Sequence, residues 1–252
     1  MQLSHAQKQY FFENGFVRLA GVVPRVLVER ARQAINASVG AGMNVADMSR
    51  FSAQSFCPEL QTSPIITDLF HATPARPLAE SMIGEARISH VGSGQIALRF
   101  PTLKDPPPKP SPHIDGVYTP ANGVPKGELH NFTALVGCYL SDVPGEADGN
   151  LTCWPGTHRQ NAAYFREHGV ENFGLPPVAL PAPFPITGSA GDVVIAHYLT
   201  AHGITQNVSA NVRYAVFFRL HSTDFAETKW DSLRNEWLQW HGMREVVGTN
   251  PT

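Results

Sequence analysis

The first 85 residues show the spacing of helices. Ser4 followed by Gln7 matches a capping box at a helix start, and Gly15 can end the same helix. Pro24 suits the first turn of a second helix, because the N–H that proline lacks is not needed there. The apolar residues at helical spacing in this second segment are Val26, Leu27, Ala31, Ala34 and Ile35. We expect both helices to brace another part of the fold.

From about residue 86 the pattern changes to short apolar runs separated by Gly, Pro, Asn and Asp. This pattern is typical of the strands of an all-β sandwich or barrel. The runs are QIALRF (95–100), NFTALVGCYL (131–140), GNLTCW (149–154), GDVVIAHYL (191–199) and RYAVFFRL (213–220). Residues 101–112 and 174–188 are rich in proline, which cannot donate into a sheet ladder, so both are predicted to be loops.

A helical pattern returns after Thr223. Trp230, Leu233, Trp237 and Trp240 follow one another at steps of three and four, which predicts one stripe of an amphipathic helix. Three tryptophans on one stripe have to be covered. Packing on the outside of the sheet is the favoured interpretation, and a homodimer contact or a pocket lid is the alternative.

Composition and charge narrow the expected partners. The 252 residues carry a formal net charge of -2 and no long basic run, so a small molecule is expected rather than nucleic acid or a membrane surface. Three widely spaced cysteines form neither a disulfide framework nor a zinc cluster, which fits a reducing compartment. The N-terminus lacks a signal-peptide pattern, and no stretch approaches the roughly 18 apolar residues of a membrane span. We therefore expect a cytoplasmic protein.

The stretch SPHIDG (111–116) offers two metal ligands. His113 and Asp115 can share one ion, because residues i and i+2 of an extended segment point the same way. Two imidazoles and one carboxylate on one face of an octahedron leave three positions open, which suits non-haem Fe(II) enzymes. The second imidazole has to come from a distant histidine. The candidates are His130, His158, His197, His202 and His221.

Among these histidines, His202 is followed eleven residues later by Arg213. If His202 ends one strand and Arg213 begins the next, an antiparallel hairpin would bring both into one cavity. Arginine is always charged, and its planar fork suits a carboxylate in a partly dry site. A metal triad beside a carboxylate clamp is a specific combination.

Three stretches, in this order and spacing over roughly residues 90 to 220, carry a family resemblance. HID (113–115) resembles a His-x-Asp element, and DGNLTCWPGTHR (148–159) is similar to Gly-x-Leu followed by Pro-Gly-Ser/Thr-His. GDVVIAHYLTAHGITQNVSANVR (191–213) is similar to His-Gly-Ser followed by Asn and Arg. Together they resemble the phytanoyl-CoA dioxygenase family of Fe(II)- and 2-oxoglutarate-dependent oxygenases. The N-terminal segment SHAQKQYFFENGFVRLAGVV also resembles the opening of that family.

The resemblance implies a mainly β fold with flanking helices. Its centre would be a double-stranded β-helix, a cupin-like jelly roll, over about residues 86–222. Helical support would fill residues 1–85 and a C-terminal amphipathic helix residues 223–252, all within a single domain covering 1–252.

The resemblance also implies a set of site residues. His113, Asp115 and His202 would hold Fe(II), and Arg213 would bind the far carboxylate of the cosubstrate 2-oxoglutarate. Relatives often add a basic or amide side chain from the strand before His-x-Asp. Arg99 is the favoured candidate for that part, and Gln95, on the same face of its strand, is the second.

Several other positions have plain structural interpretations. The PGTH stretch (155–158) fits a tight turn, so His158 is expected to bond near it rather than to bind metal. His197 lies five residues before His202 and so points to the opposite face of a strand, where a buried, hydrogen-bonded histidine is expected. Asn207 is expected to stabilise the hairpin turn.

Three places depart from the family's pattern: Pro112, the pair Gly137 and Cys138, and Ile204. Many relatives carry an aromatic or polar pocket residue at the first place, a bulky aromatic at about the second and serine at the third. These changes affect the shape of the pocket and the placement of 2-oxoglutarate, and they leave the triad intact.

The implied activity is that of a dioxygenase that consumes O2 and 2-oxoglutarate. It would hydroxylate an unactivated C–H bond of a small organic substrate and release succinate and CO2. Asp115 favours hydroxylation over halogenation, because related halogenating enzymes lack the carboxylate ligand. Desaturation, epoxidation and ring closure stay open, and so does the substrate.

Two other classes of protein remain as alternatives. One is a cupin-like metalloenzyme that does not use 2-oxoglutarate, which Arg213 disfavours. The other is a non-catalytic jelly-roll binding protein, which the intact triad disfavours.

Overall fold

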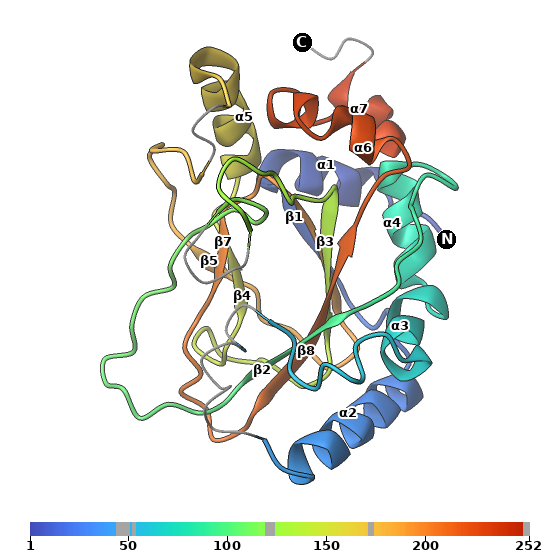
Figure 1. Ribbon diagram of the computed structural model, residues 1–252, viewed down its shortest axis with the longest axis vertical. Helices are drawn as coiled ribbons and strands as arrows, with labels where there is room; N and C mark the ends of the chain where they lie inside the picture. Colours follow the sequence, from blue (N-terminus) through green and yellow to red (C-terminus); the bar gives the residue numbers. More distant parts are fainter. Residues whose placement is uncertain (44–50, 52–53, 119–123, 171–173, 249–252) are drawn as a thin grey trace.

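Two antiparallel sheets form the centre of the computed structural model, which describes residues 1–43, 51, 54–118, 124–170 and 174–248 (Figure 1). The larger sheet has five strands in the order β1-β6-β3-β8-β2, and the smaller has three in the order β5-β4-β7. The strands are β1 (Phe16–Leu19), β2 (Gln95–Arg99), β3 (Ala134–Tyr139), β4 (Leu151–Cys153), β5 (Phe184–Pro185), β6 (Val193–His197), β7 (His202–Ile204) and β8 (Arg213–Leu220). The predicted mainly β class with flanking helices is confirmed.

Helices flank the sheets on several sides. Figure 1 shows α2, α3 and α4 along one side of the larger sheet, with α1, α6 and α7 together near one end. The helices are α1 (His5–Asn14), α2 (Arg25–Gly40), α3 (Pro64–His71), α4 (Ala75–Ile83), α5 (Thr157–His168), α6 (Phe225–Thr228) and α7 (Arg244–Val247), with short 3-10 turns η3 (Asp231–Leu233) and η4 (His241–Met243).

The larger sheet separates two hydrophobic clusters. Because side chains alternate along a strand, neighbouring residues of one strand belong to different clusters. On β8, Val216 and Phe218 belong to the cluster shared with α2, α3 and α4, whereas Ala215 and Phe217 belong to the cluster shared with the smaller sheet. Arg213 has the same parity as Phe217. The face between the two sheets therefore carries the predicted clamp.

The N-terminal predictions are confirmed with one adjustment. Ser4 and Gln7 form both bonds of a capping box, and Gly15 ends α1 in the left-handed region at φ +79°. A Cβ on Gly15 would lie 2.5 Å from Nδ1 of His158, so the position has no room for a side chain. Pro24 is the N-cap of α2 rather than a residue of its first turn.

All five apolar runs contain a strand, but two neighbouring segments differ from the prediction. The PGTH stretch runs straight into α5, which begins at Thr157, and no helix is predicted there from the sequence. Thr157, His158, Asn161 and Ala162 are all buried on this helix, so its inner face is half polar and shows no hydrophobic stripe. The proline-rich loop 174–188 also contains the short strand β5.

The expected hairpin between His202 and Arg213 is wrong. β7 lies in the smaller sheet beside β4, whereas β8 lies in the larger sheet between β3 and β2. The connection crosses from one sheet to the other, and Asn207 stabilises it as predicted. Its side chain donates to the carbonyl oxygens of Arg99 (2.8 Å) and Asn211 (2.7 Å).

The expected single amphipathic helix over 223–252 is also wrong within the described residues, which end at 248. The segment is broken into α6, η3, η4 and α7. Trp240 is 1% exposed and packs with Trp237 around Phe11 of α1, so tertiary contacts rather than a continuous helix cover these rings. Trp230 is 36% exposed. The homodimer contact stays a prediction.

In the described part of the chain, no helix is long and apolar enough to cross a membrane. The division of the single domain into helical support, core and C-terminal segment stays a prediction.

His197 is buried as predicted, and its hydrogen bonds fix a neutral imidazole. Its Nδ1 accepts from the Leu199 N–H (3.1 Å), and its Nε2 lies 2.6 Å from the Glu236 carbonyl, so Nε2 carries the proton. Burial lowers the pKa of His197 to about 3, although the bond to Glu236 opposes the shift. Its ring also stacks on Trp240.

We expect this imidazole to make the fold acid-sensitive. The unfolded chain takes up the proton near pH 6.5 and the folded chain only near pH 3, so the free energy of unfolding falls as pH drops through that window, by about 1.4 kcal/mol per pH unit for one proton. Urea unfolding at pH 7.5, 6 and 5 measures the slope, and His197→Gln should flatten it. An unchanged slope in the variant would show that other groups cause it.

Candidate metal and cosubstrate site

The backbone brings the two histidines of the predicted triad together. His113 and His202 form an antiparallel bridge in which each N–H donates to the other's carbonyl oxygen at 2.9 Å. Their side chains therefore leave the bridge on the same face, with ring centroids 4.5 Å apart. Nδ1 of His202 lies 3.0 Å from the Thr200 carbonyl oxygen, so it carries the proton and leaves Nε2 as the acceptor.

Asp115 completes the group. Its Oδ1 lies 3.6 Å from Nε2 of His113, and its Oδ2 lies 3.9 Å from Nε2 of His202. The three potential ligand atoms lie within 4.8 Å of one another, and this is the one such cluster of His, Cys, Asp or Glu found among the described residues. Two imidazoles and one carboxylate thus converge as the sequence predicts.

Charges around the triad favour an ionised carboxylate and a neutral imidazole. Burial alone would raise the pKa of Asp115, but Arg219, His202 and His113 outweigh it and the pKa is lowered. Burial, with His113 adding to it, lowers the pKa of His202 to about 4. Both groups are therefore in the protonation state that metal binding requires at neutral pH.

Arg219 was not predicted from the sequence, although a signal for it exists. Its Nη2 donates to Oδ2 of Asp115 at 3.0 Å, and its Nη1 donates to the Gln95 amide oxygen at 2.8 Å. On β8 it lies six residues after Arg213, so strand alternation puts both arginines on the face between the sheets.

Arg213 is 1% exposed and begins β8. Its Nε donates to the Gly149 carbonyl (2.8 Å) and its Nη1 to the Ala97 carbonyl (2.9 Å), which fixes the plane of the guanidinium. Its Nη2 is buried and has no hydrogen-bond partner. Burial, with Arg99 adding to it, lowers the pKa of Arg213 to about 9, so the group stays cationic at neutral pH.

Gly149 fits tightly behind this arginine. It adopts φ +78°, and a Cβ would lie 2.9 Å from Cβ of Arg99 and 3.4 Å from Cβ of Arg213. A side chain here would combine backbone strain with a clash against Cβ of Arg99.

We therefore expect Gly149→Ala to lower the free energy of unfolding by roughly 1 to 3 kcal/mol. Gly21→Ala is the matched control, because Gly21 also has a positive φ (+62°) but nothing lies within 4 Å of its added Cβ. Chemical denaturation of both variants measures the difference. Equal losses would mean that the close approach to Arg99 does not lower the free energy of unfolding.

The two proposed helper residues lie at different ends of the cavity. Arg99 is the register partner of Arg213, and burial lowers the pKa of its guanidinium. Gln95 pairs with Phe217 in register and binds Arg219, so it lies toward Asp115. The structure brings Arg99, and not Gln95, beside Arg213.

A cavity of about 600 Å³ contains the triad and Arg213. Its apolar wall includes Leu135, Leu151 and Ile204, so the position that departs from the family's serine lines the cavity. Gly137 faces Phe217 across the strand pair, and a Cβ there would lie 2.7 Å from the Phe217 ring. Phe217 thus takes the space that the bulky aromatic of many relatives would need.

The other candidate histidines fall outside the triad. His130 lines the same cavity but pairs with Glu128 at 2.8 Å, and His221 lines a neighbouring pocket. His158 is buried and bonds through Nε2 to the Phe12 carbonyl oxygen at 3.1 Å. The hydrogen-bond partner of His158 is thus on α1, and not in the turn where the sequence analysis expects it.

Solved structures resemble this fold over most of its length. The carbocyclase SnoK from nogalamycin biosynthesis, described as non-haem and α-ketoglutarate dependent, is 19% identical over 86% of this chain and 83% of its own, with a TM-score of 0.58. HygX from Streptomyces hygroscopicus, crystallised with nickel and 2-oxoglutarate, is 19% identical over 88% of each chain, with a TM-score of 0.59. The epimerase SnoN of nogalamycin biosynthesis is 18% identical, covering 88% of this chain and 86% of its own, with a TM-score of 0.52.

A sequence model of one protein family shows to which family the chain belongs. No protein of curated function matches the sequence. The model described as phytanoyl-CoA dioxygenase (PhyH), however, matches residues 11–215, which include the triad and Arg213. This match and the neighbouring structures support an enzyme of the non-haem iron, 2-oxoglutarate-dependent class. The predicted resemblance is confirmed: the chain belongs to the phytanoyl-CoA dioxygenase family.

Proposed function

We propose that the protein is an Fe(II)- and 2-oxoglutarate-dependent dioxygenase that hydroxylates an unactivated C–H bond of a small organic substrate. In this proposal His113, Asp115 and His202 hold the iron and Arg213 binds the cosubstrate. The double-stranded β-helix topology belongs to the same proposal, supported by two antiparallel sheets that share a cluster of buried residues.

The donor set fits the metal. Two imidazoles and one carboxylate form the facial set of non-haem Fe(II) oxygenases, which leaves positions for a bidentate cosubstrate and O2. The Thr200 carbonyl holds His202 in the tautomer that leaves Nε2 available, and Arg219 occupies Oδ2 of Asp115.

The observation that carries the proposal is the unpartnered Nη2 of Arg213. A buried cation is costly unless it is paired, and within the described residues no carboxylate forms an ion pair with this guanidinium. The group lines the same cavity as the triad. A dicarboxylate that reaches from the metal to Arg213 would satisfy both ends, and 2-oxoglutarate has this chemistry.

The chain's own residues position the reactants and keep water out. Arg213 would orient the cosubstrate through a charge-assisted bond, and Leu135, Leu151 and Ile204 present apolar surface beside it. Iron with 2-oxoglutarate supplies the O2 activation needed to oxidise an unreactive C–H bond.

Hydroxylation is the favoured outcome because Asp115 is present as the carboxylate ligand. The same cosubstrate chemistry supports other outcomes, since SnoK is described as a carbocyclase and SnoN as an epimerase. The substrate itself is an organic molecule small enough for a cavity of about 600 Å³.

Succinate formation tests the activity. Purified protein with Fe(II), ascorbate and 2-oxoglutarate is incubated with a panel of acyl-CoA, amino-acid, terpenoid and polyketide-like compounds. A compound that raises succinate formation and gives a product heavier by one oxygen atom supports oxygen insertion, and NMR of that product tells hydroxylation from epoxidation. Succinate without such a gain in mass would favour desaturation, ring closure or epimerisation.

A further inference from the structure

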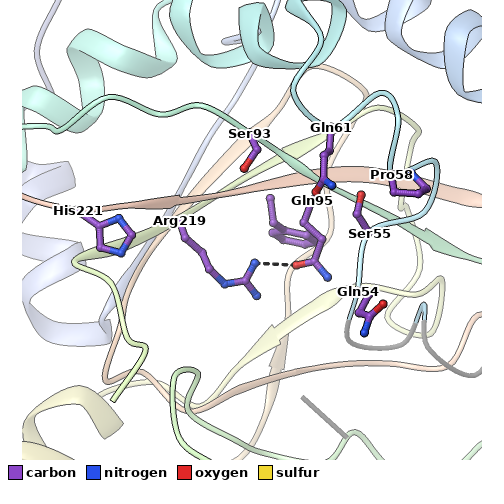
Figure 2. A pocket seen from close by; sticks show the side chains of 9 residues that line it. Gln54, Ser55, Pro58, Gln61, Ser93, Gln95, Arg219 and His221 are labelled. Carbon is purple, nitrogen blue, oxygen red and sulfur yellow. Dashed lines mark hydrogen bonds between the residues drawn. The ribbon is translucent and has the colours of Figure 1, made fainter. Parts of the chain in front are cut away.

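A second, polar pocket of about 470 Å³ lies beside the triad (Figure 2). It shares Gln95, Phe217 and Arg219 with the cavity that contains the triad, so these three side chains form the boundary between the two spaces. In Figure 2, Arg219 extends toward Gln95, with Ser93 and Gln61 above this pair in the view. A molecule that occupies both spaces therefore passes beside Asp115.

The lining of this pocket is polar but nearly uncharged. Apart from Arg219, its hydrogen-bonding side chains within the described residues are neutral amides, hydroxyls and an imidazole: Gln54, Ser55, Gln61, Ser93, Gln95 and His221. Burial lowers the pKa of His221, so this imidazole is neutral at pH 7. No lysine or carboxylate belongs to this described lining.

The charge of Arg219 is already compensated. Its Nη2 lies 3.0 Å from Oδ2 of Asp115, so an incoming anion would compete with a carboxylate already in place. A cationic ligand would meet the guanidinium with no acidic group beside it in the pocket. Two of the five guanidinium N–H groups are used by Asp115 and Gln95, which leaves others for a neutral acceptor.

We propose that this pocket, which we call the polar annex, binds a neutral polyhydroxylated group of the substrate, such as a sugar or polyol. Amide and hydroxyl side chains each donate and accept hydrogen bonds, and so do the hydroxyls of such a ligand. The reacting carbon would then lie in the neighbouring cavity, against Phe217 and the triad. This inference rests on the proposed function, because it makes the annex a subsite of the same active site.

The test compares three probes with one alkyl chain and different heads: hexyl β-D-glucoside, hexanoate and hexylamine. Saturation-transfer NMR measures the binding of each to protein loaded with Ni(II) and 2-oxoglutarate. We expect the glucoside to bind most tightly. Gln61→Leu, which removes a donor and an acceptor from the annex, should weaken glucoside binding by roughly 2- to 10-fold and leave hexanoate unchanged.

Gln160→Leu, an exposed position on α5 outside the annex, is the matched control and should change nothing. Two results would overturn the annex proposal: glucoside binding no tighter than hexanoate binding, or equal glucoside binding by Gln61→Leu and wild type. If the same samples still bind 2-oxoglutarate, the proposed function stands. Failure of the wild type to bind 2-oxoglutarate would overturn both.

Discussion

Replacing Arg213 by leucine is expected to weaken 2-oxoglutarate binding by on the order of 30-fold or more, because truncating one partner of a buried charge pair costs about 2 to 5 kcal/mol. The guanidinium is held in place by the carbonyls of Gly149 and Ala97, and its buried Nη2 has no hydrogen-bond partner. The cosubstrate's far carboxylate would be that partner. Isothermal titration calorimetry with Ni(II)-loaded protein measures the loss.

The controls for this variant separate binding from folding. Arg213→Lys keeps the positive charge but loses the planar guanidinium, so it should bind 2-oxoglutarate more tightly than Arg213→Leu and less tightly than the wild type. Arg30→Leu removes an exposed arginine on α2 and should bind 2-oxoglutarate like the wild type. Thermal melting checks that each variant is folded. A folded Arg213→Leu with wild-type affinity would remove this residue from the cosubstrate site.

Replacing His202 by alanine is expected to have a larger effect, the loss of metal binding and of metal-dependent 2-oxoglutarate binding together. Its Nε2 is one of three ligand atoms within 4.8 Å of one another, and a facial set reduced to one imidazole and one carboxylate holds Fe(II) poorly. The loss should exceed the roughly 10- to 100-fold that removal of an outer hydrogen-bond partner costs. Titration with Fe(II) under anaerobic conditions, with 2-oxoglutarate present and absent, measures both.

His130→Ala is the matched control for His202→Ala. His130 lines the same cavity but lies outside the triad, so its loss should leave metal binding intact. If His202→Ala binds metal like the wild type while His130→Ala does not, the ligand set has been assigned wrongly.

The triad could be predicted because its chemistry is encoded in residue types and spacing. His113 and Asp115 need only an extended segment to share one ion. Arg213 follows His202 after eleven residues, a spacing that is part of the family resemblance. The hairpin expected to join His202 and Arg213 is nevertheless not formed. They come from strands of different sheets, and the bridge between His113 and His202 brings the triad together.

Other features could not be read from the chain because tertiary contacts decide them. The inner face of α5 is half polar, since Asn161 donates to the Leu199 carbonyl and His158 bonds to the Phe12 carbonyl. The tryptophan stripe has helical spacing, but Trp240 packs with Phe11 and His197, and the backbone there is not a continuous helix. Apolar residues at helical spacing indicate which side chains are buried, but they can be buried without forming one continuous helix.

The position of Arg219 can be predicted in part. Alternation along β8 predicts its face, but only the folded structure shows that it bonds to Asp115 on one side and Gln95 on the other. The same contacts place it at the boundary of the polar annex. Neither the annex nor its charge balance can be derived without knowing that residues 54–61 lie beside β2 and line a pocket with Phe217 and Arg219 of β8.

The most direct test of the central claim is a titration of the wild-type protein with 2-oxoglutarate under anaerobic conditions, with and without Fe(II). We predict saturable binding that requires the metal. Binding of equal strength without metal, or no binding with metal present, would contradict the assignment of His113, Asp115, His202 and Arg213 to an iron and 2-oxoglutarate site.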